Sequence, residues 1–221
     1  PTPSASDVAG IRDAVGLADL WLDQQTAFGR LSAPAAAWSR ADWVEGTFDV
    51  WRKLVSPVAA SLGAAITGML GKQSAELAGL QPMMEPMMRA ASSGMLSAQL
   101  GQALGLLSTD VVSACDISFP LTAKPVVALL PVNVARFAEG LEQSDADVRL
   151  YLALRETARQ RLFGAVGWLG PQLLALVEHY ARGITIDAGA IEEALESQLS
   201  GQMSPADIES LGETLTGKLF E

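Results

Sequence analysis

The sequence predicts a mainly α-helical protein with a small β-hairpin or strand element around residues 111–130. Long segments carry apolar residues at helical spacing, which favours helices. Of the 221 residues, 49% are hydrophobic and 18% are charged, so the chain can bury a sizeable core. Two short apolar runs bounded by Pro and Asp, 111–119 and 125–130, are typical of strands and supply the β element.

Prolines divide the predicted helices of the first half of the chain. Asp7 is a candidate N-cap for a helix that ends near Phe28, and residues 39–55 predict a second helix after Pro34. Pro57 suits the first position of a third helix, because the N–H that proline lacks needs no partner there. We therefore expect helices that begin and end at these breaks.

A methionine-rich segment with two prolines follows at residues 81–89. We interpret its methionines as adaptable core filling, since the thioether side chain fills irregular gaps. A mobile surface that binds a partner protein is the alternative. The methionines concerned are Met83, Met84, Met87 and Met88.

The second half of the chain predicts four more helical segments before an acidic end. Residues 93–107 carry glycines that favour close helix packing, and residues 133–140 form a short helix. Longer helices are expected at 145–163 and 171–182. We thus predict a helical domain at 1–187 and an acidic helical segment at 188–221, here expected as two solvated helices.

Composition excludes several classes of function. The formal net charge of -10 argues against nucleic acid and against anionic membrane surfaces as partners. The two uncharged stretches of greatest length, 54–71 and 90–109, are too polar for a membrane span. One Cys fits a reducing compartment, so we expect a cytoplasmic protein. An unidentified protein or small molecule remains as the partner.

A zinc site is what the composition excludes most clearly. A tetrahedral zinc site of the usual kind needs three or four Cys and His ligands, and the chain has one of each. Yet Arg155-Glu156-Thr157-Ala158-Arg159 has the spacing of the zincin motif His-Glu-x-x-His, in which two histidines hold zinc and the glutamate is the general base. Arginine stays protonated and has no lone pair for a metal.

The helix around Glu156 has two largely apolar faces, so we expect it to be buried on more than one side. A carboxylate in such a place needs a partner, because an isolated buried charge is very costly. Arg155 and Arg159 are the candidate ion-pair partners. A structural ion pair is therefore the first interpretation of Glu156, and catalysis is the second.

The surrounding sequence resembles the actinobacterial zincin-like proteins, described as hydrolases or zinc-dependent metallopeptidases and related to zincin-like proteins associated with deazaflavin cofactor biosynthesis. The resemblance covers nearly the whole chain and is carried by 17–23, 39–45, 101–105, 116–121, 133–141, 150–169, 180–184 and 217–221.

The resemblance implies a zincin-like fold with Glu156 at the catalytic position. Arg155 and Arg159 occupy former metal-ligand positions, and the family's hydrolase branch often has arginine at the first of them. The family's third ligand lies on a later helix, which implies that this chain is truncated before it, beyond Glu221.

Three further residues are considered for catalytic or binding roles. His179 is a possible general base or binding residue, but a surface or helix-end histidine is the simpler interpretation. Asp116 is a possible ligand-binding carboxylate or else a turn cap. Cys115 has no basic neighbour in sequence, which indicates a buried, inert thiol.

Two functional hypotheses follow. In the first, the chain is a zincin scaffold without metal or other cofactor that binds a partner or ligand and does not catalyse hydrolysis. In the second, it is an active hydrolase that uses Glu156 with a metal held by carboxylates or completed by a C-terminal region. An interaction module built on the methionine segment is a third, weaker possibility.

Overall fold

A computed structural model describes residues 1–73, 94 and 97–183. The predictions for the methionine segment, for the acidic helices and for the boundary between 187 and 188 lie outside these residues. The chain divides into two compact units, Pro1–Leu54 with Ala98–Val177, and Val55–Ser97 with Glu178–Glu221. The first unit contains Glu156 and both arginines of the motif.

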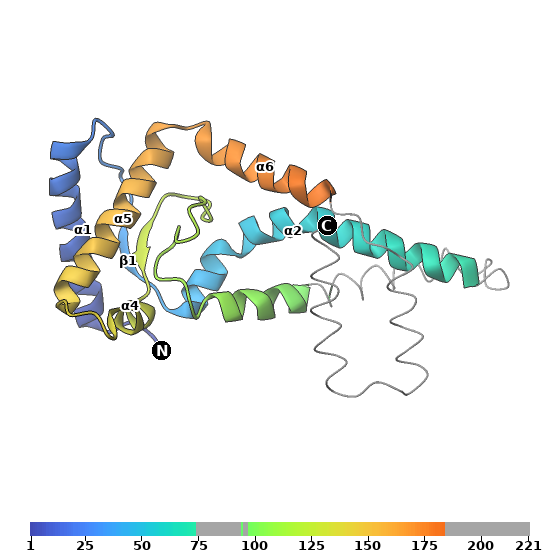
Figure 1. Ribbon diagram of the computed structural model, residues 1–221, viewed down its shortest axis with the longest axis horizontal. Helices are drawn as coiled ribbons and strands as arrows, with labels where there is room; N and C mark the ends of the chain where they lie inside the picture. The colour runs from blue at the N-terminus through green and yellow to red at the C-terminus, as the bar shows by residue number, and fades with distance from the viewer. Residues whose placement is uncertain (74–93, 95–96, 184–221) are drawn as a thin grey trace. The chain divides into compact units, whose positions relative to one another are not determined.

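The structure is mainly helical with one small sheet, as predicted (Figure 1). Residues 97–107 are also helical. The helices and strands in chain order are α1 (Ala5–Gln25), β1 (Ala35–Ala37), α2 (Arg40–Gln73), β2 (Val127–Leu129), α4 (Pro131–Ala138), α5 (Asp145–Ala165) and α6 (Leu169–Gly183). No helix among these described residues combines the length and apolar character needed to cross a membrane.

The start of α1 corrects the predicted cap. Ser4, not Asp7, is the N-cap: its hydroxyl accepts the N–H of Asp7 at 3.2 Å, and the Asp7 carboxylate accepts the N–H of Ser4 at 2.8 Å. This reciprocal capping box satisfies two of the backbone donors that a helix start leaves unpaired. Ser144 likewise accepts the N–H of Asp147 at 3.1 Å before α5.

Helix α2 is one helix where the sequence predicted two. Pro57 lies inside it and does not begin a new helix. Proline removes one hydrogen bond from the preceding turn, but its fixed φ is itself helical, so hydrogen bonding can resume after it.

The sheet differs from the expected hairpin. β2 falls within the predicted run 125–130, but it pairs in parallel with β1, with Ala36 opposite Ala128. The run 111–119 forms turns and a single antiparallel bridge, from Ser113 to Leu129. Backbone N–H groups of this run bond to side-chain carboxylates of the candidate site, which competes with a strand ladder.

The core that positions α5 lies between α1, α5 and the sheet. Its fully buried members include Ile11 and Ala18 on α1, Leu129 on β2, and Leu152 and Ala153 on α5. A second cluster surrounds Trp43 on α2 and Leu104 on the helix of residues 97–107. These two clusters hold α5 and the loop 111–126 in fixed relation within the first unit.

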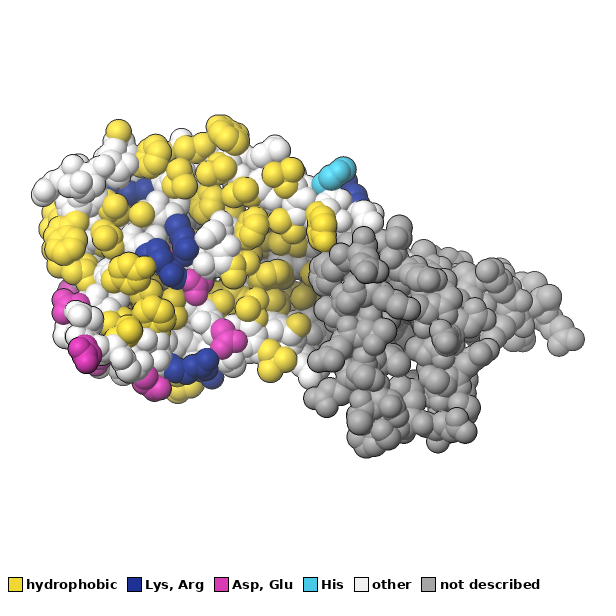
Figure 2. Space-filling view, in the orientation of Figure 1, with side chains coloured by type: hydrophobic (Ala, Val, Ile, Leu, Met, Phe, Trp, Pro, Cys, Tyr) yellow, Lys and Arg dark blue, Asp and Glu magenta, His cyan; other side chains and the backbone are white. Residues whose placement is uncertain are grey.

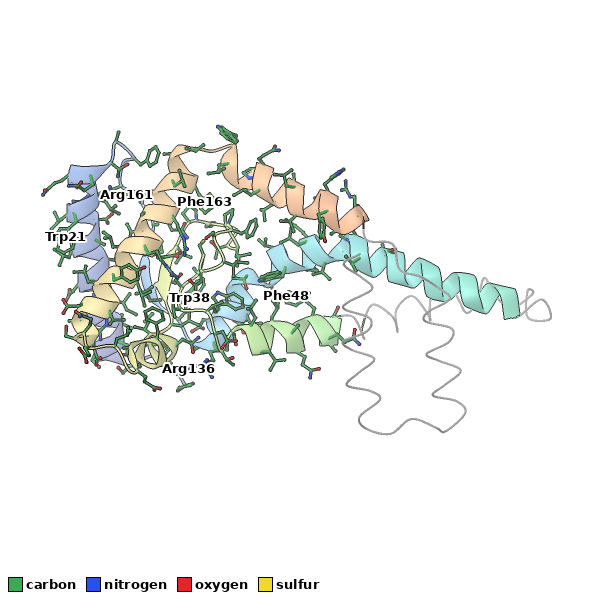
Figure 3. The ribbon with its side chains drawn as sticks, in the orientation of Figure 1. Trp21, Trp38, Phe48, Arg136, Arg161 and Phe163 are labelled. Carbon is green, nitrogen blue, oxygen red and sulfur yellow. The ribbon has the colours of Figure 1, made fainter. Side chains whose placement is uncertain are left out.

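A buried arginine ties α1 to α5. Arg161, with 1% of its side chain exposed, donates to the Asp19 carboxylate at 2.6 Å, to Asp23 at 2.8 Å and to the carbonyl of Phe28 at 3.1 Å. Figure 3 shows Arg161 on the same stretch of α5 as Phe163. The buried charge is thus neutralised by two carboxylates of α1, as burial of an ion requires.

Candidate functional site on helix α5

The Glu156 carboxylate is fully buried and is held by neutral donors. Its Oε2 accepts the Ser113 hydroxyl at 2.8 Å, and its Oε1 accepts the Gln160 amide at 3.0 Å. The Cys115 N–H lies 3.2 Å and 3.3 Å from the two oxygens. No cation of the described residues lies within ion-pair distance of it, so the predicted ion pair with Arg155 or Arg159 is wrong.

Burial raises the pKa of Glu156 above its ordinary value. The hydrogen bonds from Gln160 and Ser113, the charge of Arg159 and the Cys115 N–H act in the opposite direction. Removing a charge from water is the largest influence here, since neutral donors replace only part of the lost hydration.

Arg155 and Arg159 share one carboxylate, that of Asp116. Arg155 Nη2 binds Asp116 Oδ1 directly, while Arg159 Nη1 lies 3.8 Å from the same oxygen. Arg159 Nη1 also donates to the Cys115 carbonyl at 3.2 Å. The arginine side chains are 29% and 23% exposed, so the pair lies at the boundary between core and solvent.

Asp116 fixes a turn, which is one of the two roles that the sequence left open, and it also pairs with the arginines of the motif. Its Oδ2 accepts the N–H of Val112 at 2.9 Å, which fixes the turn, and its Oδ1 faces the arginines. The turn continues to Ser118, whose N–H bonds to the Cys115 carbonyl at 2.8 Å and whose φ of 66° is left-handed. A non-glycine residue rarely adopts this conformation, so the turn is held by its surroundings.

Cys115 is buried, as predicted. Burial first, and the nearby Glu156 charge second, raise the pKa of its thiol to about 12. The Gln160 amide lies 3.1 Å from its Sγ. A thiol with such a pKa stays protonated at neutral pH and is a poor nucleophile.

His179 is exposed on α6 and belongs to the second unit. The residues that bind Glu156, Arg155 and Arg159 all belong to the first unit. Within the first unit, the structure brings Asp116 to the motif residues.

Sequence reasoning missed Ser113 and Gln160, which supply two of the donors to Glu156. Gln160 had a readable signal, because a residue four positions after Glu156 lies on the same face of a helix. Ser113 is 43 residues away in the chain and has no such signal.

The donor set does not fit zinc. Among the described residues, no three His, Cys, Asp or Glu side chains are grouped so that they could hold a metal ion. Both oxygens of Glu156 already accept hydrogen bonds, and Asp116 is occupied by Arg155 and by a backbone N–H. Two guanidinium groups beside these carboxylates would also repel a dication.

Basic side chains gather beside α5 on the face that Figure 2 shows. An acidic side chain lies next to them, and hydrophobic side chains surround them. This agrees with the partial exposure of Arg155, Arg159 and Asp116.

Comparison with known proteins identifies the scaffold. No curated protein and no solved structure matches this chain. A family model described as zincin-like metallopeptidase matches residues 1–221, which is the whole chain. The helical fold, the buried Glu156 and the complete match of the family model agree, and the chain belongs to the zincin-like metallopeptidase family.

Proposed function

We propose that this chain is a zincin-like protein without zinc, and that its motif helix serves to bind a ligand or partner and not to hydrolyse one. The observation that carries the proposal is the position of Arg155 and Arg159. They stand where the motif has histidines, and their shared partner is Asp116. A guanidinium cannot coordinate a metal.

The surroundings of Glu156 support the same proposal. A general base must reach the proton it abstracts, directly or through one water. Glu156 is fully buried, and donors of the protein itself occupy both of its oxygens. In this arrangement both oxygens of Glu156 are bonded to the protein itself, and the carboxylate organises the turn 113–118.

The proposal also includes the relatives, the location and the domain division of the protein. We infer a relationship to the actinobacterial members associated with deazaflavin cofactor biosynthesis, a cytoplasmic location, and a division into a domain at 1–187 and an acidic segment at 188–221. The similarity of the segments named above supports the first of these, and the single Cys supports the second.

An active hydrolase is the alternative proposal. The retained Glu156 favours it, because burial raises its pKa toward the range useful to a general base. In this case residues outside the described ranges would complete the site, and Glu156 would have to leave its present hydrogen bonds.

The zinc content of the purified full-length protein tests the proposal. We expect far less than one equivalent after dialysis against zinc, and no peptidase activity that the Glu156→Gln variant removes. The Arg155→His/Arg159→His variant is the matched gain-of-function test. It restores both imidazoles of the motif, so we expect tighter Zn²⁺ binding than in the unmodified chain, read from the visible spectrum of bound Co²⁺.

One equivalent of zinc in the unmodified protein, lost in Glu156→Gln, would contradict the proposal and favour the hydrolase. A double-histidine variant that folds but gains no metal would show that the arginines are not what excludes zinc, and it would remove the observation that carries the proposal.

A further inference from the structure

We propose that Arg155 and Arg159 form a binding site for a carboxylate that is attached to an apolar group, and that the natural ligand is the C-terminal end of a peptide. The inference deepens the proposed function, since it requires that guanidinium groups and not a metal occupy the motif. It goes further in naming the chemical group that the site recognises.

The first argument is an excess of positive charge. Two guanidinium groups face one carboxylate, Asp116, and the second carboxylate of the cluster, Glu156, is bound by a hydroxyl, an amide and a backbone N–H. Among the described residues, the pair therefore has one carboxylate partner, Asp116, for two permanent cations. An anion from solution would supply the missing counter-charge where the local dielectric constant is low.

The second argument is unused hydrogen-bonding capacity. Within the described residues Arg155 Nε is buried without a hydrogen-bond partner, and Arg159 Nη1 donates to the Cys115 carbonyl but lies 3.8 Å from Asp116, too far for a hydrogen bond to that carboxylate. A buried donor without an acceptor is costly. A guanidinium presents its donors as a planar fork that matches the two oxygens of a carboxylate.

The third argument is access with apolar flanks. Both arginines keep about a quarter of their side chains exposed. Tyr151, Arg155, Arg159 and Phe163 follow one another at four-residue spacing on α5, so each neighbours the next along one stripe. Tyr151 is 55% exposed and Phe163 is partly buried. A basic pair between two aromatic side chains suits a carboxylate with apolar groups beside it.

The charge of the whole chain restricts the anion further. A net charge of -10 repels polyanions such as nucleic acid at long range. A single carboxylate is repelled least. A peptide end combines one terminal carboxylate with apolar side chains, and a peptide also suits a scaffold of a metallopeptidase family.

The binding test uses the fluorescein-labelled tetrapeptide Gly-Ala-Leu-Phe and the full-length protein, with fluorescence polarisation as the readout. We expect the peptide with a free C-terminal carboxylate to bind at least about tenfold more tightly than its C-terminal amide, since a charged hydrogen bond contributes about that factor. The amide of Gly-Glu-Leu-Phe tests a side-chain carboxylate as the source. Benzoate as competitor tests a small free acid, and inorganic phosphate tests a different anion.

Matched arginine variants localise the effect. Arg159→Gln should weaken binding of the carboxylate peptide about tenfold and leave the amide unchanged. Arg136→Gln is the control, because Arg136 also pairs with an aspartate, Asp110 at 2.9 Å, and also donates to a backbone carbonyl, but lies elsewhere on the surface. Arg159→Lys should recover part of the affinity, because it keeps the charge and loses the fork. Thermal unfolding of each variant verifies that it is folded.

Equal binding of the acid and the amide, or equal loss in Arg159→Gln and Arg136→Gln, would overturn the inference, as would preference for phosphate or for the internal glutamate. The zinc content of the same samples separates the two proposals. A zinc-free protein without carboxylate preference overturns the inference alone, and stoichiometric zinc overturns the proposed function itself.

Discussion

Glu156 is a residue whose chemistry is set by its surroundings more than by its motif. Its three donors come from a turn and from its own helix, and no cation in the part of the chain that the structure describes lies within ion-pair distance of it. Burial therefore raises its pKa, in contrast to a carboxylate that an arginine contacts. The folded protein consequently holds a proton on Glu156 more tightly than the unfolded chain does.

This difference gives stability a defined pH dependence. Because the folded-state pKa is raised above the ordinary 4.5, the contribution of Glu156 is fully present below pH 4.5 and is lost as pH rises through the folded-state pKa. We expect the free energy of unfolding of the unmodified protein, relative to Glu156→Gln, to fall from pH 4.5 toward neutrality. Urea unfolding of both proteins across this range measures the difference.

Glu142→Gln is the control for this experiment, because Glu142 is an exposed carboxylate just before α5. It should leave the pH dependence of the unmodified protein in place. A carboxyl ¹³C titration of Glu156 provides a second measurement should Glu156→Gln be too unstable. A titration midpoint at or below 4.5 would contradict the expectation.

The sequence was sufficient to identify Arg155, Glu156 and Arg159, because the spacing of the zincin motif can be recognised without a structure. It was not sufficient to pair them. The partner of Arg155 is Asp116, 39 residues earlier, and the Ser113 hydroxyl reaches Glu156 across 43 residues. Contacts over such separations depend on how a turn and a helix pack, and local patterns do not encode that.

At the scale of elements, the attachment of α1 to α5 depends on Arg161. Its guanidinium is 1% exposed and binds Asp19, Asp23 and the Phe28 carbonyl, so it joins one helix and the loop after it to another helix. Ile11, Val15 and Ala18 of α1 also belong to one apolar cluster with Leu152 and Ala153 of α5.

Arg161→Met should destabilise the protein by about 3 kcal/mol, because it leaves Asp19 facing the interior without its counter-ion. The change in the urea midpoint measures this. Arg30→Met is the matched control: Arg30 also binds Asp23, but with 48% of its side chain exposed, and exposed pairs contribute little. Equal destabilisation by the two variants would show that burial of Arg161 does not matter.

Helices were predictable to within a few residues where caps and periodicity agree, as at Ser144 and along α5. They were less so at Pro57, where a strong local signal for a helix start was overridden within α2. Strand β1 gave no signal at all, because Ala35–Ala37 lacks the branched and aromatic side chains that favour strands. It is a strand because β2 lies beside it and supplies its hydrogen bonds.

At the scale of the whole molecule, the single Cys is a reporter of unfolding in the first unit. Cys115 is fully buried with a pKa raised to about 12 by burial, so both access and thiolate formation are suppressed. We expect iodoacetamide at about pH 8 to modify the folded protein far more slowly than the urea-unfolded chain. Mass spectrometry reads this directly, because there is one site.

The rate of this modification should rise in Arg161→Met and not in Arg30→Met if opening of the first unit limits it. Rapid, complete alkylation of the folded protein would contradict the buried position of Cys115.

The fold class and the family follow from properties spread over the whole chain, which explains why they were predictable while individual contacts were not.

The arginines of α5 also change what the molecule depends on. A bound metal ion can dissociate. The occupancy of its site depends on the supply of the ion, and chelators or acid remove the ion and its charge. The guanidinium groups of Arg155 and Arg159 are instead covalent parts of the protein, and they stay positively charged at any pH that cells experience. If Arg155 and Arg159 bind the ligand as proposed, that binding does not require a metal, and EDTA should leave the affinity for the carboxylate peptide unaltered.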